Sequence, residues 1–221
     1  MATVAPEVAG GLGLISELSG QGIRVSLGHS AADYDTGLAG LRAGANMLTH
    51  VFNAMEPLHH RSPGLAGLMG SHDEPYYSII ADGIHVHPTV QTMAYRTNPR
   101  RCILITDAIE LTGLPDGVHP GHAQIPLPQR KSGNRVTIDG TETLIGSCSG
   151  LDGCVRNLMH GSNCSLAEAV RCVTENIAHM MGLKDRGMLE VGRCADFVVL
   201  SSIGEVMQTW VSGQRVYQTE K

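Results

Sequence analysis

Two histidines stand near the ends of short apolar runs, and imidazole is a common metal ligand. His29 follows the run over residues 22–27, and His50 lies in the next run, over residues 46–51. If both runs are strands of one sheet, the two rings project from the same edge, where zinc or iron(II) can take neutral imidazole nitrogen. A catalytic metal site normally also has a third protein ligand and a position for water. From the spacing alone, hydrogen bonds from each histidine to loop backbone are an equally good interpretation.

Asp107 follows the apolar residues 103–105 and one threonine. A carboxylate at the end of a buried strand must be hydrogen-bonded, bound to a metal or functional, because its desolvation is costly. Asp107 is therefore a candidate general base. The alternative is an N-cap for the segment that follows, since aspartate is a preferred capping residue.

Three further side chains have types that suit a substrate. Arg61 ends a His-His-Arg loop, and its planar fork suits an oxyanion or a phosphate. A solvated surface arginine is the ordinary alternative. His85 stands three residues after Asp82, beyond another apolar run, where it could bind substrate or metal or have a structural role.

These residues are separated by apolar runs that alternate with helical stretches. We expect strands over residues 22–27, 46–51, 77–82 and 102–107, helices over 11–19 and 31–43, and the end of an earlier strand at 3–7. Alternation of this kind predicts an α/β fold with a parallel sheet. The candidate residues would then stand at the carboxyl ends of strands, where α/β barrels and open sheets carry their chemistry.

The second half of the chain changes character twice. The Pro- and Gly-rich residues 114–146 predict a β insertion or lid. Helices are expected over 150–160 and 165–181, and Ser165 with Glu168 forms a capping box at the start of the second. Short strands follow over 195–200, 209–211 and 214–217, with a turn at Ser212 and Gly213. We therefore divide the chain into a catalytic region, 1–186, and a C-terminal β region, 187–221.

Charge and composition exclude several classes of protein. Lys and Arg number 16 against 21 Asp and Glu, a net charge of −5, which argues against binding nucleic acid or an anionic membrane by bulk charge. No apolar run is long enough to span a membrane, and the first residues have no signal-peptide pattern. The six cysteines form no CxxC pair, which favours the reducing cytoplasm over a disulfide scaffold.

Several segments, in this order, resemble the second half of the N-acetylglucosamine-6-phosphate deacetylase family of the amidohydrolase superfamily. They are residues 28–30 (Gly-His-Ser), 49–55, 59–61 (His-His-Arg), 81–85 and 105–108. Residues 3–7 and the tail segments 192–200 and 211–217 are also similar, so the resemblance covers nearly the whole chain. It implies a TIM-like (β/α)₈ barrel, here incomplete with about its fourth to eighth strands, plus the C-terminal part of a small β-sandwich.

The same resemblance implies a role for each matching residue. His29 and His50 would bind one divalent metal ion, zinc first, with iron(II), cobalt and manganese as alternatives, and Asp107 would be the catalytic acid and base. Contacts to the substrate would come from Asn53, Ala54, Arg61, Asp82, His85, Leu144, Ile145 and Gly146. The implied reaction converts N-acetylglucosamine 6-phosphate to glucosamine 6-phosphate and acetate, in a cytoplasmic homodimer whose subunits share part of the phosphate site.

The chain departs from this family at its start. The first three barrel strands are missing, and so is the Glu-Gly-Pro segment that carries the family's metal-binding glutamate. Glu7 follows the fourth strand and does not replace that ligand. We therefore expect little or no deacetylase activity from this chain by itself. Open strand edges and an uncovered apolar face also predict poor solubility or pairing with another chain.

Besides the possibility that the chain does not fold stably at all, two other interpretations remain open. One is a different amidohydrolase, similar to dihydroorotase or adenosine deaminase, although the His-His-Arg loop favours an amino-sugar phosphate over a nucleobase. The other is a non-catalytic fragment or splice product that binds phosphosugar or pairs with a full-length deacetylase, and the missing glutamate supports it.

Overall fold

Five parallel strands lie side by side in the order in which they occur along the chain. The computed structural model, which describes residues 1–219, contains β1 (Ala2–Val4), β2 (Val25–Leu27), β3 (Met47–Leu48), β4 (Tyr76–Ile80) and β5 (Cys102–Ile105) in one sheet. All four neighbouring pairs are parallel, which confirms the predicted α/β sheet. Strands β3 and β5 end earlier than predicted because the chain bends sharply at His50 (φ +27°) and Asp107 (φ +50°), whereas β2 starts three residues later than predicted.

One face of this sheet packs against helices. The helical elements are α1 (Gly11–Gly20), α2 (Tyr34–Arg42), the 3₁₀ helix η1 (Leu65–Gly70), α3 (Pro88–Thr97), α4 (Leu151–Ser162) and α5 (Leu166–Arg171). Side chains alternate between the two faces of a strand, and the helix-facing ones form the main core, which includes Leu27, Leu48, Tyr77, Ile79 and Leu104. Burial of these large side chains is the main source of stability in this layer.

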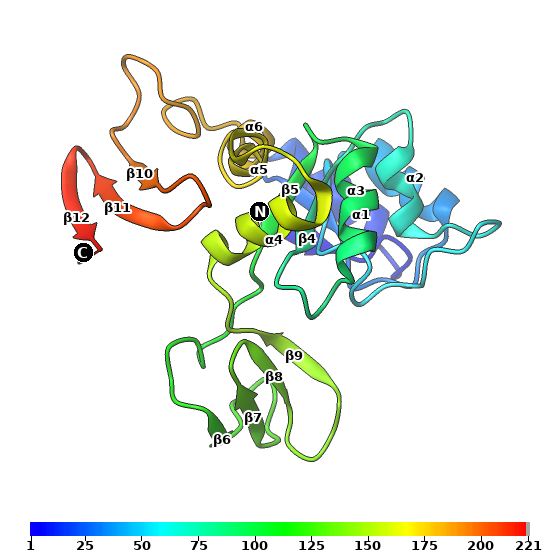
Figure 1. The fold of residues 1–221 in the computed structure, drawn as a ribbon. Coiled ribbons are helices and arrows are strands. Elements are labelled where there is room, and N and C mark those ends of the chain that lie inside the picture. The colour runs from blue at the N-terminus through cyan, green and yellow to red at the C-terminus, as the bar shows by residue number, and fades with distance from the viewer. Residues whose placement is uncertain (220–221) are drawn as a thin grey trace.

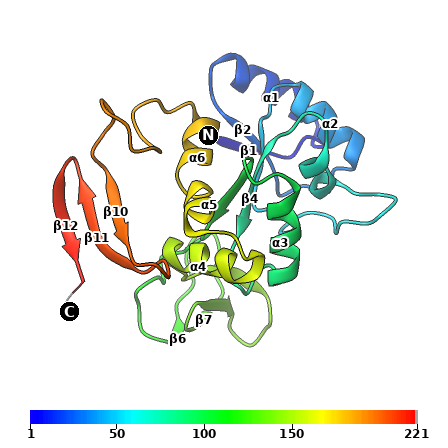
Figure 2. The same cartoon turned by 45° about the horizontal axis from the view of Figure 1, so that its top comes forward.

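A second, smaller core lies on the opposite face of the sheet. Met47 and Ile103 alternate with the main-core residues and pack against Met180 of α6 (Glu175–Met181). We expected this apolar face to be uncovered, and α6 covers part of it. Figure 2 shows α4, α5 and α6 between the parallel sheet and the C-terminal strands.

The single helix predicted over residues 165–181 is wrong, because the chain forms two helices, α5 and α6. The capping box of Ser165 and Glu168 is present at the start of α5. The carbonyl oxygen of Cys172 accepts a hydrogen bond of 3.0 Å from the backbone N–H of Leu104 in β5, so it is directed at the sheet instead of continuing the helix. This break lets α6 turn onto the second face of the sheet.

Two antiparallel sheets stand apart from the parallel one (Figure 1). The first contains β6 (Gly117–His119), β7 (Gln129–Ser132), β8 (Arg135–Ile138) and β9 (Leu144–Ser147), in the segment where a β insertion is expected. The second contains β10 (Phe197–Leu200), β11 (Val206–Val211) and β12 (Gln214–Gln218), with the predicted turn at Ser212 and Gly213. Residues 220–221 of the expected C-terminal region lie outside the described residues. In the described part of the chain, no helix has the length and apolar character of a membrane span.

The Tyr77 hydroxyl group is a buried cross-link between β4 and the end of α3. Its single O–H hydrogen is shared between the carbonyl oxygens of Ala94 (2.8 Å) and Asn98 (2.9 Å), and its oxygen accepts from the Asn98 N–H (3.1 Å). Tyr77→Phe leaves those backbone groups without their partner, so we expect it to lower the free energy of unfolding by about 2 kcal/mol. Urea unfolding measures this loss, with Tyr34→Phe, a change at a half-buried tyrosine, as the control. Equal losses of unfolding free energy in the two variants would contradict the role of the Tyr77 hydroxyl.

Candidate active site

The candidate metal-binding and catalytic residues, like the candidate substrate residue Ala54 (φ +48°), adopt a backbone conformation that L-residues rarely take. His29, His50 and Asp107 have φ values of +50°, +27° and +50°, and each follows a strand of the parallel sheet: β2, β3 and β5. Such a conformation costs on the order of 1 kcal/mol or more and is concentrated at functional sites. The bends place these side chains at the carboxyl edge of the sheet, as the sequence predicts.

The imidazoles of His29 and His50 meet directly. Their Nε2 atoms are 2.8 Å apart, and their rings lie edge to face with centroids 4.6 Å apart. The Nδ1 atom of His50 lies 3.2 Å from the carbonyl oxygen of Asn53, so Nδ1–H donates there and the Nε2 lone pair faces His29. The backbone N–H of His50 donates to the Ser78 hydroxyl oxygen at 2.8 Å, which fixes the bend.

The electrostatic surroundings favour the neutral form of His50. Burial lowers the pKa of His50, and the neighbouring His29 lowers it further, against the opposing effects of backbone hydrogen bonds and of Asp107. The influence of Asp107 also shows that this carboxylate lies within electrostatic range of the histidine pair. A neutral imidazole is the form that binds a metal ion.

The histidine pair fits two positions of a divalent metal ion. Two nitrogens on one tetrahedral zinc ion lie about 3.3 Å apart, so the rings need to separate by only about 0.5 Å from their observed contact. Among residues 1–219, no group of three His, Cys, Asp or Glu side chains is arranged to hold a metal. Within the described residues, the histidine pair could therefore supply two of the three protein ligands that a catalytic site normally has.

Glu7 supports the loop that carries His29. Its carboxylate oxygens accept hydrogen bonds from the Ser30 hydroxyl (2.6 Å) and from the backbone N–H of Ala31 (2.8 Å). Burial raises the pKa of Glu7, but these hydrogen bonds outweigh it and hold the pKa below its ordinary value. This contact was not predictable from the sequence, because the partners lie 23 and 24 residues further along the chain.

Ala54 lies beside His29. The Ala54 carbonyl oxygen accepts from the Ser30 N–H at 3.0 Å, so the loop after β3 is joined to the loop after β2. An open cavity of about 430 Å³ lies there, lined by His29, Ser30, Ala31, Ala54, Met55 and Glu56. Asn53 is the predicted substrate residue next to Ala54, and its carbonyl oxygen accepts the hydrogen bond from Nδ1 of His50. Its side-chain amide nitrogen lies within 3.5 Å of the His50 and Val51 carbonyl oxygens.

Asp82 and His85 form a buried pair after β4. Oδ2 of Asp82 lies 2.6 Å from Nδ1 of His85, and Oδ1 accepts from the backbone N–H groups of Ile84 (2.8 Å) and His85 (2.9 Å). The Asp82 side chain is fully buried. Burial raises the pKa of this carboxyl, but the hydrogen bonds from His85 and from the two N–H groups together hold it below its ordinary value. Asp82 thus orients the ring of His85 and directs Nε2 away from itself.

Asp82→Asn should lower the free energy of unfolding by about 2 kcal/mol at pH 7, because charge-assisted hydrogen bonds are lost. Since the folded-state pKa of Asp82 is depressed, its contribution is present above the ordinary pKa of 3.8 and is lost as the pH falls through the lower folded-state value. Urea unfolding between pH 7 and pH 3 tests this: the gap between wild type and variant should narrow toward pH 3. The exposed Asp73→Asn is the control, and a gap independent of pH would contradict the account.

Strand β9 is attached to the chain just after β5, beside Asp107. The Ser147 N–H donates to the Asp107 carbonyl oxygen at 3.0 Å, and the Ile109 N–H donates to the Ser147 carbonyl oxygen at 3.0 Å. Gly146 has a φ of +131°, and a Cβ there would lie 2.5 Å from Ile109. Of the predicted substrate residues, Gly146 therefore lies against Asp107, whose side chain is exposed, and Leu144 and Ile145 precede it in β9. No helix begins after Asp107, so its alternative interpretation as an N-cap is wrong.

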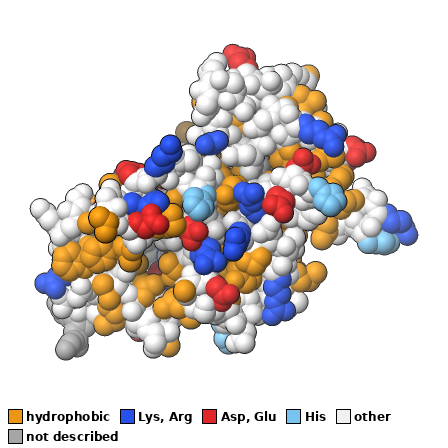
Figure 3. Space-filling view, turned by 90° about the horizontal axis from the view of Figure 1, so that it is seen from above, with side chains coloured by type: hydrophobic (Ala, Val, Ile, Leu, Met, Phe, Trp, Pro, Cys, Tyr) orange, Lys and Arg blue, Asp and Glu red, His pale blue; other side chains and the backbone are white. Residues whose placement is uncertain are grey.

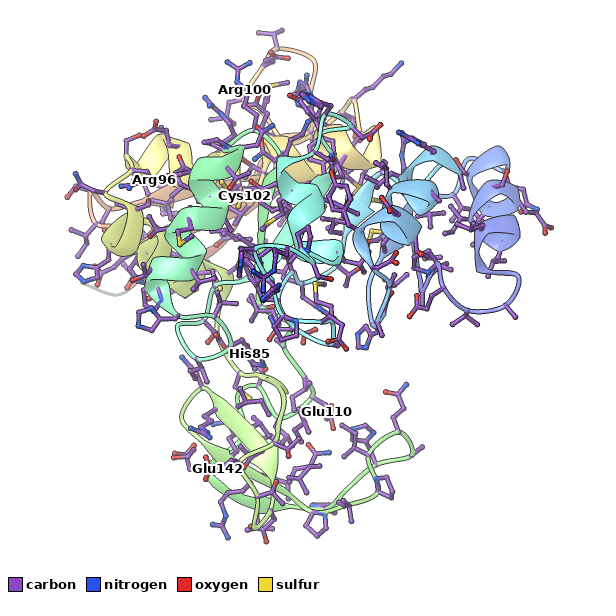
Figure 4. All side chains as sticks on the ribbon, turned by 90° about the vertical axis from the view of Figure 1, so that its right-hand side faces the viewer. His85, Arg96, Arg100, Cys102, Glu110 and Glu142 are labelled. Carbon is purple, nitrogen blue, oxygen red and sulfur yellow. The ribbon has the colours of Figure 1, made fainter. Side chains whose placement is uncertain are left out.

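Arg61 is exposed and lies in the segment between β3 and η1. It lies on an exposed turn in which the Ser62 N–H donates a hydrogen bond of 3.1 Å to the His59 carbonyl oxygen. The backbone N–H of Arg61 donates to Nδ1 of His59. Within residues 1–219, no hydrogen bond or ion pair joins Arg61 to Asp82 or His85. Figure 4 shows His85 at the end of the parallel sheet that faces the β6–β9 sheet. The structure thus joins His29, His50, Asn53 and Ala54, and separately joins Asp107 with residues 144–146.

Sequence comparison identifies relatives along nearly the whole chain. The profile of the amidohydrolase family matches residues 14–216. N-acetylglucosamine-6-phosphate deacetylase of Danio rerio is 41% identical over 225 residues, 99% of this chain and 55% of that protein. The Homo sapiens protein of the same name is 39% identical, with 99% and 54% covered. This chain therefore spans about half the length of the curated relatives that it matches.

Solved structures give the same picture. N-acetyl-D-glucosamine-6-phosphate deacetylase from Mycobacterium smegmatis superposes with a TM-score of 0.90 at 32% identity, over 97% of this chain and 57% of that one. A mutant of that enzyme in complex with N-acetyl-D-glucosamine-6-phosphate gives a TM-score of 0.89 at 34% identity, over 97% and 56%. An enamidase, at 13% identity and a TM-score of 0.62, shares the fold.

Proposed function

The chain belongs to the amidohydrolase family, and from that membership we propose that it carries part of the active site of a metal-dependent deacetylase. The reaction is hydrolysis of the acetamide of N-acetylglucosamine 6-phosphate to glucosamine 6-phosphate and acetate. The observation that carries this proposal is the contact of His29 with His50 at the sheet edge, with Asp107 within electrostatic range. The names of the relatives at about 40% identity support the substrate.

Each residue has a defined task in this proposal. His29 and His50 hold one divalent ion, zinc in the first place, which when bound polarises the amide carbonyl and makes water more acidic. Asp107 takes a proton from the attacking water and passes it to the departing amine, so that water and amide yield acetate and free amine. Its exposed position after β5 gives it access to both.

The substrate would bind around this centre. Ala54 and Asn53 border the sugar from the His29 side, and backbone groups of residues 144–146 contact it beside Asp107. Arg61 and His85 are the phosphate partners, and Asp82 fixes the ring of His85. Because Arg61 stands on an exposed turn without contact to His85, we infer a homodimer in which it serves the neighbouring subunit.

We also propose which part of a barrel fold this chain forms. The five parallel strands correspond to the fourth to eighth strands of a (β/α)₈ barrel, with the catalytic region at 1–186 and part of a small sandwich from 187. Their consecutive order and the half-length match to relatives support this. A cytoplasmic location is supported by the six cysteines, all of which are free thiols.

A second candidate function is a non-catalytic chain that binds phosphosugar or pairs with a full-length deacetylase. The specific observation in its favour is that residues 1–219 hold no third metal-binding side chain at the histidine pair. Both candidate functions involve the phosphosugar, but only the deacetylase converts it to products.

Fusing the chain to the part of the Danio rerio relative that it does not span tests the proposed function. We expect the fusion to release acetate from N-acetylglucosamine 6-phosphate, and to do so poorly from unphosphorylated N-acetylglucosamine. A folded, metal-loaded fusion that releases acetate equally from both would contradict the phosphate roles. A folded fusion with no turnover would favour the non-catalytic candidate.

A further inference from the structure

A polar cavity of about 500 Å³ lies at the amino ends of the strands. Its walls come from the segment before β4, the segment between α3 and β5, and helices α5 and α6. Strand β4 starts at Tyr76 beside this cavity, and Asp82 follows its other end. Six residues at about 3.3 Å each put the cavity roughly 20 Å from the candidate active site. Figure 4 shows Arg100 at the top of the view and His85 on the opposite side of the parallel-sheet layer, just above the β6–β9 sheet.

Guanidinium groups outnumber carboxylates in this cavity. Arg100, Arg101 and Arg171 line it against Glu74 and Glu175, and the imidazole of His179 also borders it. Figure 3, which looks onto this end of the molecule, shows Lys and Arg side chains gathered with acidic ones and a histidine near the middle of the face. The two carboxylates balance two of the three guanidinium groups, which leaves one positive charge in the cavity for an anion.

The ion pairs leave part of this positive charge available. The pair Arg101–Glu74 is 3.6 Å long and Arg171–Glu175 is 3.2 Å long, and all four side chains are at least one third exposed. Such exposed pairs are weak and exchange partners at little cost. Within the described residues, the guanidinium of Arg100 forms no hydrogen bond or ion pair, although its backbone N–H donates to Oδ1 of Asn98.

A second cavity gives the site room for an organic group. It has a volume of about 250 Å³ and shares Glu74, Tyr76 and Arg101 with the first. Arg101 stands between the two with its guanidinium 4.5 Å from the centre of the Tyr76 ring, which holds its plane in place. A phosphate in the first cavity would therefore have an adjoining space for the group it esterifies.

We propose that these two cavities form a binding site for a small phosphate monoester, separate from the active site and independent of the proposed deacetylase function. Planar arginine forks bind the tetrahedral dianion through paired hydrogen bonds, which lysines do less well. Arg100 supplies a free fork, and Arg101 and Arg171 turn from their glutamates toward the phosphate. The combined space lies in the size range of small-molecule sites.

Isothermal titration of the whole chain with glycerol 3-phosphate tests the site, with orthophosphate and glycerol as separate arms. We expect saturable binding of glycerol 3-phosphate, weaker binding of orthophosphate and none of glycerol. Arg100→Gln combined with Arg171→Gln should weaken binding about tenfold or more, whereas Glu74→Gln should strengthen it by removing repulsion. Arg130→Gln, an exposed arginine on the β6–β9 sheet, is the matched control and should change nothing.

Binding that survives the double variant in a folded chain would overturn the proposal, as would no binding to the wild type. Orthophosphate binding as tight as the ester would overturn the role of the second cavity. Phosphate binding that is lost in Arg61→Gln but retained in the double variant would place the anion at the proposed substrate site instead. That outcome would overturn this inference and leave the proposed function standing.

Discussion

Asp107→Asn should lower the kcat of the fusion by about 10³-fold, because an amide at this position can neither accept nor return the proton. The variant keeps the shape of the side chain, and the Asp107 carbonyl oxygen still accepts from Ser147. Bound metal should therefore remain at the wild-type level while turnover of N-acetylglucosamine 6-phosphate falls. Acetate release and metal content are measured on the same samples.

Asp139→Asn is the matched control for this loss. Asp139 also follows a strand, and it pairs at the surface with Arg130 at 2.7 Å. We expect its kcat to equal that of the parent fusion. If kcat falls less than about tenfold in Asp107→Asn, Asp107 does not transfer the proton, and another group carries out that step.

His50→Gln should weaken binding of Zn²⁺ to this chain by about 100-fold or more, because one of two ligands is lost. Glutamine retains a side-chain amide but has no imidazole nitrogen to give to the ion. A competition titration with a chromogenic chelator measures the affinity, and His29→Gln should give a similar loss.

The control for zinc binding is His160→Gln, an exposed histidine on α4. It should bind zinc as the wild type does. If His50→Gln and His160→Gln bind zinc equally, the contact between the two imidazoles is a structural one, and the metal assignment is wrong.

The parallel sheet was predictable because its strands are short apolar runs at regular distances, separated by helical stretches. The break between α5 and α6 was not predictable, because it depends on a hydrogen bond from Leu104 to Cys172, 68 positions apart along the chain. The same break places Met180 against Ile103 on the second face. Local periodicity carries no information about such a long-range contact.

Within the candidate site, the meeting of His29 and His50 was predictable from the rule that parallel strands end at one edge. The hydrogen bonds from the His29 loop to Glu7 were not predictable, since an acidic residue after a strand can form many different contacts. The position of Arg61 also differs from simple expectation, because a loop of this length can direct an arginine inward or outward. Its exposed position follows from the tight turn at His59 and Ser62.

Metal content and deacetylation of N-acetylglucosamine 6-phosphate by the 221-residue chain, without any fusion, test the central claim most directly. The claim is that this chain holds two metal ligands and the catalytic aspartate, and that the third ligand comes from elsewhere. It predicts weak zinc binding that depends on His50, and no turnover above an Asp107→Asn variant. Stoichiometric metal with turnover that disappears in Asp107→Asn would contradict it, because the described residues would then complete the site by themselves.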